Sequence, residues 1–225
     1  MKEKLRAEWK KIQSMQGREK WEYIWGYYKI HIIGVSAALL MTGSIVNDIF
    51  INPPPSSVLT IAWMGGFEME WQLNALRDAL YPMVVEDPSS ETVHILTFFI
   101  TGTDPQQDMA QHTRFSAMVA ARELDIVIGT LEYNEEAEIL ALGMAPSWFF
   151  SDLRPFLAQA GIEPDGVIFY EAEEGYPVAF AVPMEGSALF EEVGLFTEGR
   201  WLGIVGNTLR DEAVTYAVRA LLTSS

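Results

Sequence analysis

The stretch IHIIGVSAALLMTGSIV, residues 30–46, separates two chemically different parts of the chain. It carries no formal charge if His31 is neutral, and residues 49–51 extend its apolar character past Asp48. About 20 such residues span the hydrocarbon of a bilayer, because a helix rises ~1.5 Å per residue. We therefore predict one transmembrane helix over residues 30–51, and this is the part of the chain that we expect to contact lipid.

The residues before this stretch set its expected orientation. Residues 1–29 hold eight Lys and Arg against four Glu, a net charge of +4. Aromatic side chains favour the headgroup level of a membrane, and five of them precede the apolar stretch: Trp21, Tyr23, Trp25, Tyr27 and Tyr28. Basic residues concentrate on the cytoplasmic side of membrane proteins. These features predict a single-pass protein of the cell membrane with a cytoplasmic N-terminus and an extracellular C-terminal domain.

Two alternatives compete with a retained anchor. A buried core helix can be equally apolar, but it needs neither an aromatic belt nor a basic flank. A cleaved signal peptide has an apolar region of ~7–15 residues followed by an A-x-A-like site. The apolar region of this chain is longer, and no such site follows it. Retention as an anchor is therefore the favoured interpretation.

Short segments flank the predicted anchor on both sides. In the basic segment 1–29, four apolar residues recur at spacings that place them on one face of a helix: Leu5, Trp9, Ile12 and Met15. That helix lies on the anionic inner leaflet, or its charges serve only to fix the topology. After the anchor, NPPPSS at residues 52–57 favours extended polyproline geometry and predicts a stiff spacer. We expect an extracytoplasmic domain over residues 58–225.

The composition of the outer part excludes several chemistries. Residues 52–225 hold seven Arg and no Lys against 26 Asp and Glu, a net charge of −19. Such a surface repels nucleic acid, so we expect no nucleic-acid partner. The chain has no cysteine, which excludes a disulfide framework, a thiolate metal site and a cysteine nucleophile.

Five apolar runs in the outer part have the character of β-strands. They are VLTIAWMGG (58–66), VHILTFFITGT (93–103), LDIVIGT (124–130), PVAFAVPM (177–184) and WLGIVGNT (201–208). Most of these runs are continuously apolar rather than alternating. Continuous apolarity suits strands that are covered on both faces, as in parallel sheets.

Helical patterns fill the gaps between these runs. Apolar residues step by three and four over 69–83, and Asp104-Pro105 opens a helix that runs to about residue 123. Further helices fit 147–160 and 209–222. Strands that alternate with helices predict an α/β fold in which a mainly parallel sheet has helices on both faces.

Two stretches of the outer part carry a family resemblance. FSAMVAARELDIVIG, residues 115–129, resembles the helix-to-strand passage of type II periplasmic (extracellular) solute-binding proteins. FFSDLRPFLAQAG, residues 149–161, resembles the helix that follows that strand. This likeness covers about residues 58–222. WEYIWGYYKIHII, residues 21–33, also resembles the opening of small uncharacterised membrane proteins of Gram-positive bacteria that carry one transmembrane helix.

The resemblance implies a binding function on a reduced scale. Members of the family usually have two lobes with the ligand between them, whereas residues 58–225 of this chain number only 168. The resemblance therefore implies a single lobe that recognises a small-molecule ligand or presents it to a transporter or sensor. The alternative is a non-catalytic scaffold whose partner is another membrane protein.

We expect a ligand site at the carboxyl ends of the strands, where open parallel sheets bind their ligands. Glycines allow a ligand to approach the backbone, hydroxyls offer hydrogen bonds, and an indole ring offers a flat apolar wall. The same residue types also serve turns and caps at strand ends. The candidate residues at these ends are Trp63, Gly65, Gly66, Thr101, Thr103, Gly129, Thr130, Glu132, Asn207 and Thr208.

No catalytic or cofactor-binding pattern is legible in the sequence. It contains none of the motifs G-x-S-x-G, G-x-x-x-x-G-K-[ST] or G-x-G-x-x-G. The three histidines, His31, His94 and His112, have no partner at metal-ligand spacing, and we expect His94 in the core. We interpret the acidic clusters 132–138 and 171–174 as solvated faces. We therefore expect a protein that is not an enzyme and that holds neither a metal nor a cofactor.

Overall fold

The computed structural model describes residues 13–65, 68–100, 104–130, 133–134, 139–140, 146–163, 165–171 and 175–223. The chain divides into two compact units, Met1–Pro54 and Pro55–Ser225. Three of the four residues of the predicted apolar face, Leu5, Trp9 and Ile12, lie outside the described residues.

The described part of the first unit is helical. Helix α2 (Gly17–Val46) continues into the π-helical turn η1 (Asn47–Ile51), and the prolines that follow cannot extend it. From Tyr28 to Ile51 this helix is apolar and long enough to cross a bilayer, and none of that span is buried. It is the one such helix in the part of the chain that the structure describes. A candidate membrane span near the N-terminus is thereby confirmed.

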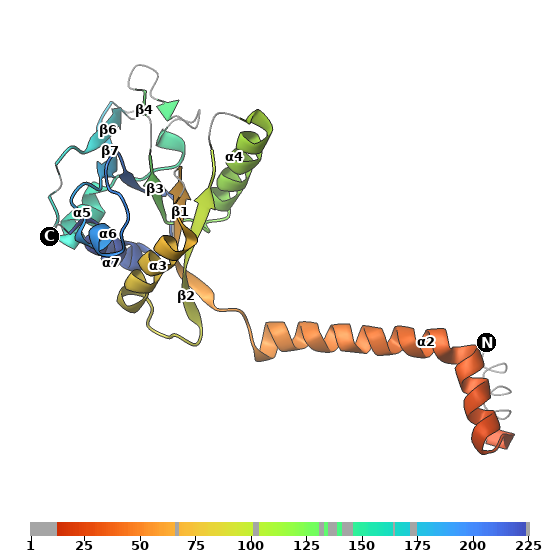
Figure 1. The fold of residues 1–225 in the computed structure, drawn as a ribbon. Coiled ribbons are helices and arrows are strands. Elements are labelled where there is room, and N and C mark those ends of the chain that lie inside the picture. Colours follow the sequence, from red (N-terminus) through yellow and green to blue (C-terminus); the bar gives the residue numbers. More distant parts are fainter. Residues whose placement is uncertain are drawn as a thin grey trace. The chain divides into compact units, whose positions relative to one another are not determined.

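The second unit is built on a six-stranded sheet in the order β2-β1-β3-β8-β7-β6 (Figure 1). The bounds of these strands are β1 (Ser56–Met64), β2 (Glu91–Phe98), β3 (Ile126–Gly129), β6 (Ile168–Glu171), β7 (Pro177–Pro183) and β8 (Trp201–Ile204). A separate pair joins β4 (Tyr133–Asn134) to β5 (Ile139–Leu140). Because β1 begins at Ser56, the spacer is shorter than predicted.

The sheet is mixed, and the prediction of a mainly parallel sheet is wrong. Strand β1 pairs in parallel with β2 and β3. Strand β8 runs antiparallel to β3, and the pairs β8–β7 and β7–β6 are also antiparallel. The error has a physical reason: a continuously apolar run indicates that both faces of a strand are covered, but it does not indicate the direction of its neighbour.

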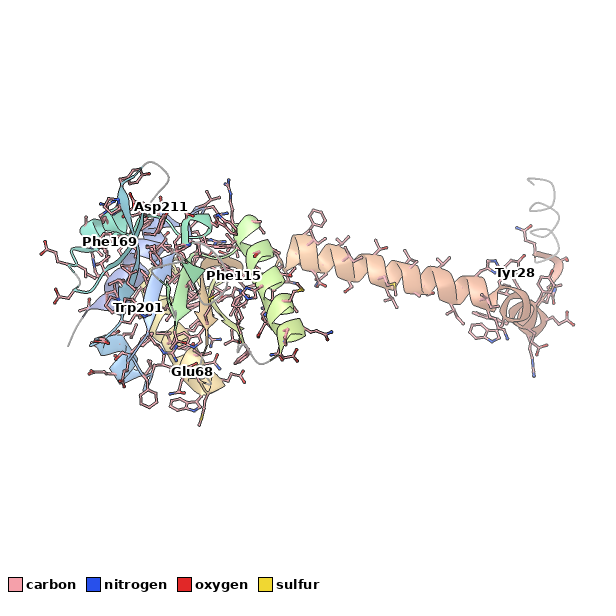
Figure 2. All side chains as sticks on the ribbon, turned by 90° about the horizontal axis from the view of Figure 1, so that it is seen from above. Tyr28, Glu68, Phe115, Phe169, Trp201 and Asp211 are labelled. Atoms are coloured by element: carbon pink, nitrogen blue, oxygen red, sulfur yellow. The ribbon has the colours of Figure 1, made fainter. Side chains whose placement is uncertain are left out.

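Helices cover both faces of this sheet, as predicted. On one face, α3 (Glu70–Val84), α5 (Arg154–Ala160), α6 (Ala188–Glu192) and α7 (Asp211–Leu222) pack in one layer. On the other face lie α4 (Pro105–Ala120) and the 3₁₀ turn η2 (Pro146–Trp148). Phe115, labelled in Figure 2, is a buried residue of α4 and belongs to the core cluster on this face. The domain is therefore a three-layer α/β structure.

Alternation along β1 divides the core between these two faces. Leu59, Ile61 and Trp63 belong to the cluster beneath the four-helix layer. Ala62 and Met64 belong to the cluster beneath α4, with Phe115 and Phe180. A central strand that is buried on both faces explains why residues 58–64 read as one apolar run.

The helices agree with the sequence-based predictions only in part. The side chain of Asp104 caps α4 by accepting hydrogen bonds from the amides of Gln106 and Gln107, at 3.0 and 3.2 Å, so this prediction is confirmed. The helix predicted over 147–160 is limited to α5, because Phe150 instead forms a β-bridge with Val205. Strand β6 and helix α6 were not predicted.

Candidate functional site

The structure places the predicted site residues at two opposite ends of the sheet. Trp63 and Gly129 lie at the carboxyl ends of β1 and β3, with Gly65 and Thr130 immediately after them. Four of the expected residues lie outside the described residues: Gly66, Thr101, Thr103 and Glu132.

Asn207 and Thr208 do not join this edge, which corrects the prediction. Since β8 is antiparallel to β3, its carboxyl end lies at the amino end of β3. There the side-chain amide of Asn207 donates to the carbonyl of Val119 at 2.6 Å, and the hydroxyl of Thr208 donates to Asp125 at 2.5 Å. Both residues stabilise the far end of the sheet.

Trp63 is not the open apolar wall that the sequence led us to expect. Its side chain is only 1% exposed and packs against Phe190, with ring centroids 5.8 Å apart. The guanidinium carbon of Arg200 lies 4.5 Å from the centroid of the indole ring. The indole Nε1 donates a hydrogen bond of 2.6 Å to Oε2 of Glu68.

A buried ion pair completes this arrangement. Nη2 of Arg200 pairs with Oε1 of Glu68, and the two side chains are 6% and 11% exposed. Nε of Arg200 donates to the carbonyl of Phe196 at 3.0 Å. Burial lowers the pKa of Arg200, because the charged guanidinium loses its hydration. We call Trp63, Glu68 and Arg200 the buried triad.

The sheet topology brings the triad together. Glu68 lies in the connection from β1 to α3, and Arg200 directly precedes β8. The antiparallel register pairs Gly129 with Trp201, so the start of β8 lies at the carboxyl ends of β1 and β3. Two residues 132 positions apart in the chain therefore meet over the ring of Trp63.

The glycines at this edge are used for close packing. A Cβ on Gly129 would lie 1.9 Å from the carbonyl oxygen of Met64, so any side chain there would clash with the neighbouring strand. Gly65 adopts φ of 69°, and a Cβ there would lie 2.6 Å from the hydroxyl of Thr130. At both positions the space beside the glycine is therefore occupied by a neighbouring part of the same chain.

Large apolar side chains are exposed next to the buried triad. Met69 follows Glu68 directly, and its sulfur accepts a hydrogen bond of 3.1 Å from the indole of Trp71. Phe196 is the residue whose carbonyl holds Arg200. The exposed fractions of Met69, Trp71 and Phe196 are 64%, 59% and 82%. We call these three residues the apolar patch.

A hydrogen bond ties the two segments of the apolar patch to each other. The side-chain amide of Gln72, in the first turn of α3, donates to the carbonyl of Gly194 at 2.5 Å. A Cβ on Gly194 would lie 3.8 Å from the Trp71 ring. The start of α3 and the segment before β8 are therefore in direct contact.

Asp125 organises the opposite end of the sheet. Its buried carboxylate accepts from the amide of Thr60 at 2.7 Å, from the hydroxyl of Thr208 and from Nη1 of Arg210 at 2.9 and 3.0 Å. These bonds join the strands β1 and β3 to the segment that leads into α7. By joining these segments, Asp125 has a structural role.

The structure also shows where the other residues that the sequence singled out lie. His94 is exposed on β2, so the expectation of a core histidine is wrong, because an edge strand leaves this side chain uncovered. In the segment 146–150, Phe149 and Phe150 are buried while Trp148 is 71% exposed. The described residues contain no group of three or more His, Asp and Glu that could hold a metal ion.

Sequence reasoning did not identify Glu68 or Arg200. Arg200 is one of only seven cations in the outer part, and it directly precedes an apolar run. An arginine in such a position needs a partner when the strand is buried. That was the available signal, but the identity of the partner depends on the direction of β8.

No protein-family model matches this chain, and neither a curated protein nor a solved structure matches it.

Proposed function

We propose that the chain is a membrane-anchored module whose outer domain binds a protein partner on the extracytoplasmic side. The observation that carries the proposal is the contrast at one edge of the sheet. The buried triad fills the place where a solute was expected, and the apolar patch beside it is open to solvent. Of the two functions that the sequence suggested, this is the scaffold that binds another protein, and not the lobe that resembles type II solute-binding proteins and recognises a small molecule.

The buried triad makes the edge a poor solute pocket. Arg200 lies over the ring of Trp63 and pairs with Glu68. A ligand that bound to this ring would have to displace Arg200 and so separate it from Glu68 inside the protein. Breaking a buried ion pair by removing one partner costs about 3–5 kcal/mol, because the remaining charge is left without compensation. A small neutral or cationic solute has no carboxylate that could replace Glu68 as the counter-charge of Arg200.

The apolar patch has the composition of a protein interface. Tryptophan and other large aromatic residues dominate the binding energy at such interfaces, and Trp71 and Phe196 are more than half exposed. The underlying buried triad holds the patch in place through the backbone of Phe196. A patch that is rigid before binding loses little conformational entropy when a partner docks.

Charge defines the partner further. The outer part has a net charge of −19, and exposed carboxylates of Glu70 and Glu198 are adjacent in sequence to the patch. An acidic domain attracts basic surfaces and repels acidic ones over a Debye length. The partner is therefore a protein with a basic surface that is present outside the same membrane.

The orientation is part of the proposal. The candidate membrane span from Tyr28 to Ile51 supports single-pass anchoring. The excess of Lys and Arg before it supports a cytoplasmic N-terminus by the positive-inside rule. The acidic domain, with no Lys, is then extracytoplasmic.

Photo-crosslinking in living cells tests this function. A photoreactive phenylalanine analogue replaces Trp71 or Phe196 in the full chain, and Phe169, which is 47% exposed on β6, serves as the control position. We expect adducts with the same protein at both patch positions and not at the control. Absence of adducts at the patch, or equal adducts at all three positions, would contradict the proposal.

A small ligand remains a second candidate because of one observation. Nη1 of Arg200 is buried and has no hydrogen-bond partner among the described residues. A ligand carbonyl or carboxylate is a suitable acceptor for it. This function predicts a solute that raises the melting temperature of the wild-type chain but not of the Arg200→Lys variant.

A further inference from the structure

One edge of the sheet lacks the usual protection against strand pairing. Strand β2 has eight residues and pairs only with β1 among the described residues. Natural edge strands are commonly short, bulged or interrupted by Lys or Pro. The opposite edge, β6, follows this rule, since it has only four residues. The pairing of β2 with β1 has an irregularity between Ser57 and Leu59 and is regular over the rest of β2. Strand β2 contains neither Lys nor Pro, and Glu91 at its start is its only acidic or basic residue apart from His94.

The direction of the free backbone groups on β2 follows from one hydrogen bond. The carbonyl of Phe98 accepts from the amide of Gly65, so Phe98 points its backbone groups toward β1. Backbone groups alternate in direction along a strand. Ile95 and Thr97 therefore direct their N–H and C=O groups outward, away from β1. These groups form a ladder that a further strand would complete.

A groove runs along this free edge. Its volume is about 430 Å³, and its two walls are β2 and the first two turns of helix α3. His94, Thr97 and Phe99 line it on the strand side, and Leu73, Asn74 and Arg77 line it on the helix side. Such a groove gives the side chains of an added strand both apolar and polar contacts.

The groove adjoins the buried triad and the apolar patch. Glu68 lines the groove and pairs with Arg200, while the next residue, Met69, belongs to the patch. Figure 2 labels Glu68 beside α3. A partner that follows β2 toward its carboxyl end therefore reaches the patch.

We propose that an extended, basic segment of a protein partner adds to the free edge of β2 as a seventh strand and places alternate side chains in the groove beside α3. This inference rests on the proposed partner-binding function and assigns the form in which the partner binds. Main-chain hydrogen bonds to Ile95 and Thr97 supply affinity, and the groove supplies specificity.

Charge selects a basic segment over a second copy of this chain. In a dimer formed through β2, two outer domains that each have a net charge of −19 would meet edge to edge. Long-range electrostatic repulsion opposes such a dimer. At the groove, the carboxylate of Glu70 is exposed, whereas Arg77 is already paired with Asp78 at 2.8 Å. Lysine or arginine in an added strand compensates this excess of carboxylate.

The test uses the full chain in phosphatidylcholine nanodiscs and two capped decapeptides, one of alternating Val and Lys and the other of alternating Val and Glu. Binding is measured by fluorescence anisotropy. We expect the Val–Lys peptide to bind about tenfold more tightly than the Val–Glu peptide, because of the charge of the domain. Equal binding of both peptides, or binding of neither, would overturn the inference.

A matched pair of variants separates the backbone from the side chain. Thr97→Pro removes the outward N–H and leaves the bonds between β1 and β2 in place, as edge strands tolerate. Thr97→Val changes the side chain but keeps the N–H. We expect Thr97→Pro to weaken binding of the Val–Lys peptide about five- to tenfold, as for one lost hydrogen bond, and Thr97→Val to bind as the wild type does.

Amide hydrogen exchange on the wild-type chain makes the test independent of how the proline variant folds. The Val–Lys peptide should slow exchange at Ile95 and Thr97, whose amides point away from β1, more than at His94 and Leu96, whose amides face β1. No added protection at Ile95 and Thr97 would overturn the inference. A concentration-dependent dimer that protects the same amides would assign the edge to a second copy and overturn the choice of partner.

The results also separate this inference from the proposed function. If crosslinks form at Trp71 and Phe196 in cells and Thr97→Pro leaves them unchanged, the partner-binding function stands and strand addition fails. If the peptide protects β2 but no partner crosslinks at the patch, the edge binds strands and the proposed function fails.

Discussion

The guanidinium of Arg200 stacks on the ring of Trp63, with 4.5 Å between the guanidinium carbon and the ring centroid. The same indole donates a hydrogen bond to Glu68, the carboxylate that is paired with Arg200. Each member of the buried triad therefore contacts the other two. The end of β1, the connection before α3 and the start of β8 are joined at this point, and the apolar patch is built on it.

Loss of Arg200 should destabilise the outer domain strongly. Arg200→Ala leaves the carboxylate of Glu68 buried without a counter-charge, and we expect the free energy of unfolding to fall by about 3–5 kcal/mol. The double variant Arg200→Met with Glu68→Gln removes both charges and should recover most of this loss. Denaturant unfolding followed by circular dichroism measures both effects. A double variant as unstable as Arg200→Ala would show that the ion pair is not the cause.

Truncation of Trp63 distinguishes a core residue from a ligand wall. Because its side chain is 1% exposed, Trp63→Ala should lower the free energy of unfolding by about 3–5 kcal/mol. Trp71→Ala, at an indole that is 59% exposed, is the matched control and should change stability by less than about 0.5 kcal/mol. If the two variants melt alike, Trp63 is not part of the core in solution.

The buried carboxylate of Asp125 should be equally sensitive. Asp125→Ala leaves the amide of Thr60 and the hydroxyl of Thr208 without their acceptor, and each unsatisfied buried group costs about 1–3 kcal/mol. We expect a total loss of about 3 kcal/mol or more, compared with almost none for Asp165→Ala at an exposed aspartate. Thermal melts of the two variants measure the difference, and similar melting temperatures would refute the structural role of Asp125.

The sequence predicted the fold to the extent that burial determines it. Residues 58–64 and 124–129 were recognised as strands because both of their faces are covered. Strand β6 was missed, since its side chains are only partly buried and its apolar run is short. The direction of β8 was not predictable, because an apolar run indicates that both faces of a strand are covered but does not indicate whether its neighbour is parallel or antiparallel.

The candidate site was predictable only in part for the same reason. Trp63, Gly129 and Thr130 were placed at the correct edge because β1 and β3 are parallel. Asn207 and Thr208 were placed at the wrong edge because β8 was taken as parallel to them. Arg200 could not be paired with Glu68 from sequence, since the two are 132 residues apart and meet only when β8 reverses.

Acid should weaken the contact between Asp152 and Arg154. Partial burial acts to raise the pKa of Asp152, but the hydrogen bonds and charge of Arg154 outweigh it and hold this pKa below its ordinary value of 3.8. The folded-state pKa is thus depressed, so the stabilisation is present above pH 3.8 and is lost as the pH falls through the lower folded-state value.

Asp152→Asn should therefore melt at a lower temperature than the wild type near neutral pH, and the difference should shrink as the pH falls below 3.8. Melting temperatures between about pH 2 and 7 measure this trend. Arg154 also donates to the carbonyl of Pro177 at 2.9 Å, a bond that Asp152→Asn leaves in place. A stability difference that stays constant over the whole range would show that the carboxylate charge is not involved.

Cysteine labelling tests the membrane orientation, because the natural chain contains no cysteine and gives no background. Gln13→Cys and Glu198→Cys place single thiols at exposed positions on the two sides of the candidate membrane span. The +4 charge of residues 1–29 predicts that a membrane-impermeant maleimide labels Glu198→Cys in intact cells, and that it labels Gln13→Cys only after the membrane is permeabilised. The reverse pattern would place the N-terminus outside. Labelled Glu198→Cys chains that lack the N-terminal segment would show cleavage of the anchor, and labelling of neither position before permeabilisation would place the acidic domain in the cytoplasm and refute an extracytoplasmic partner.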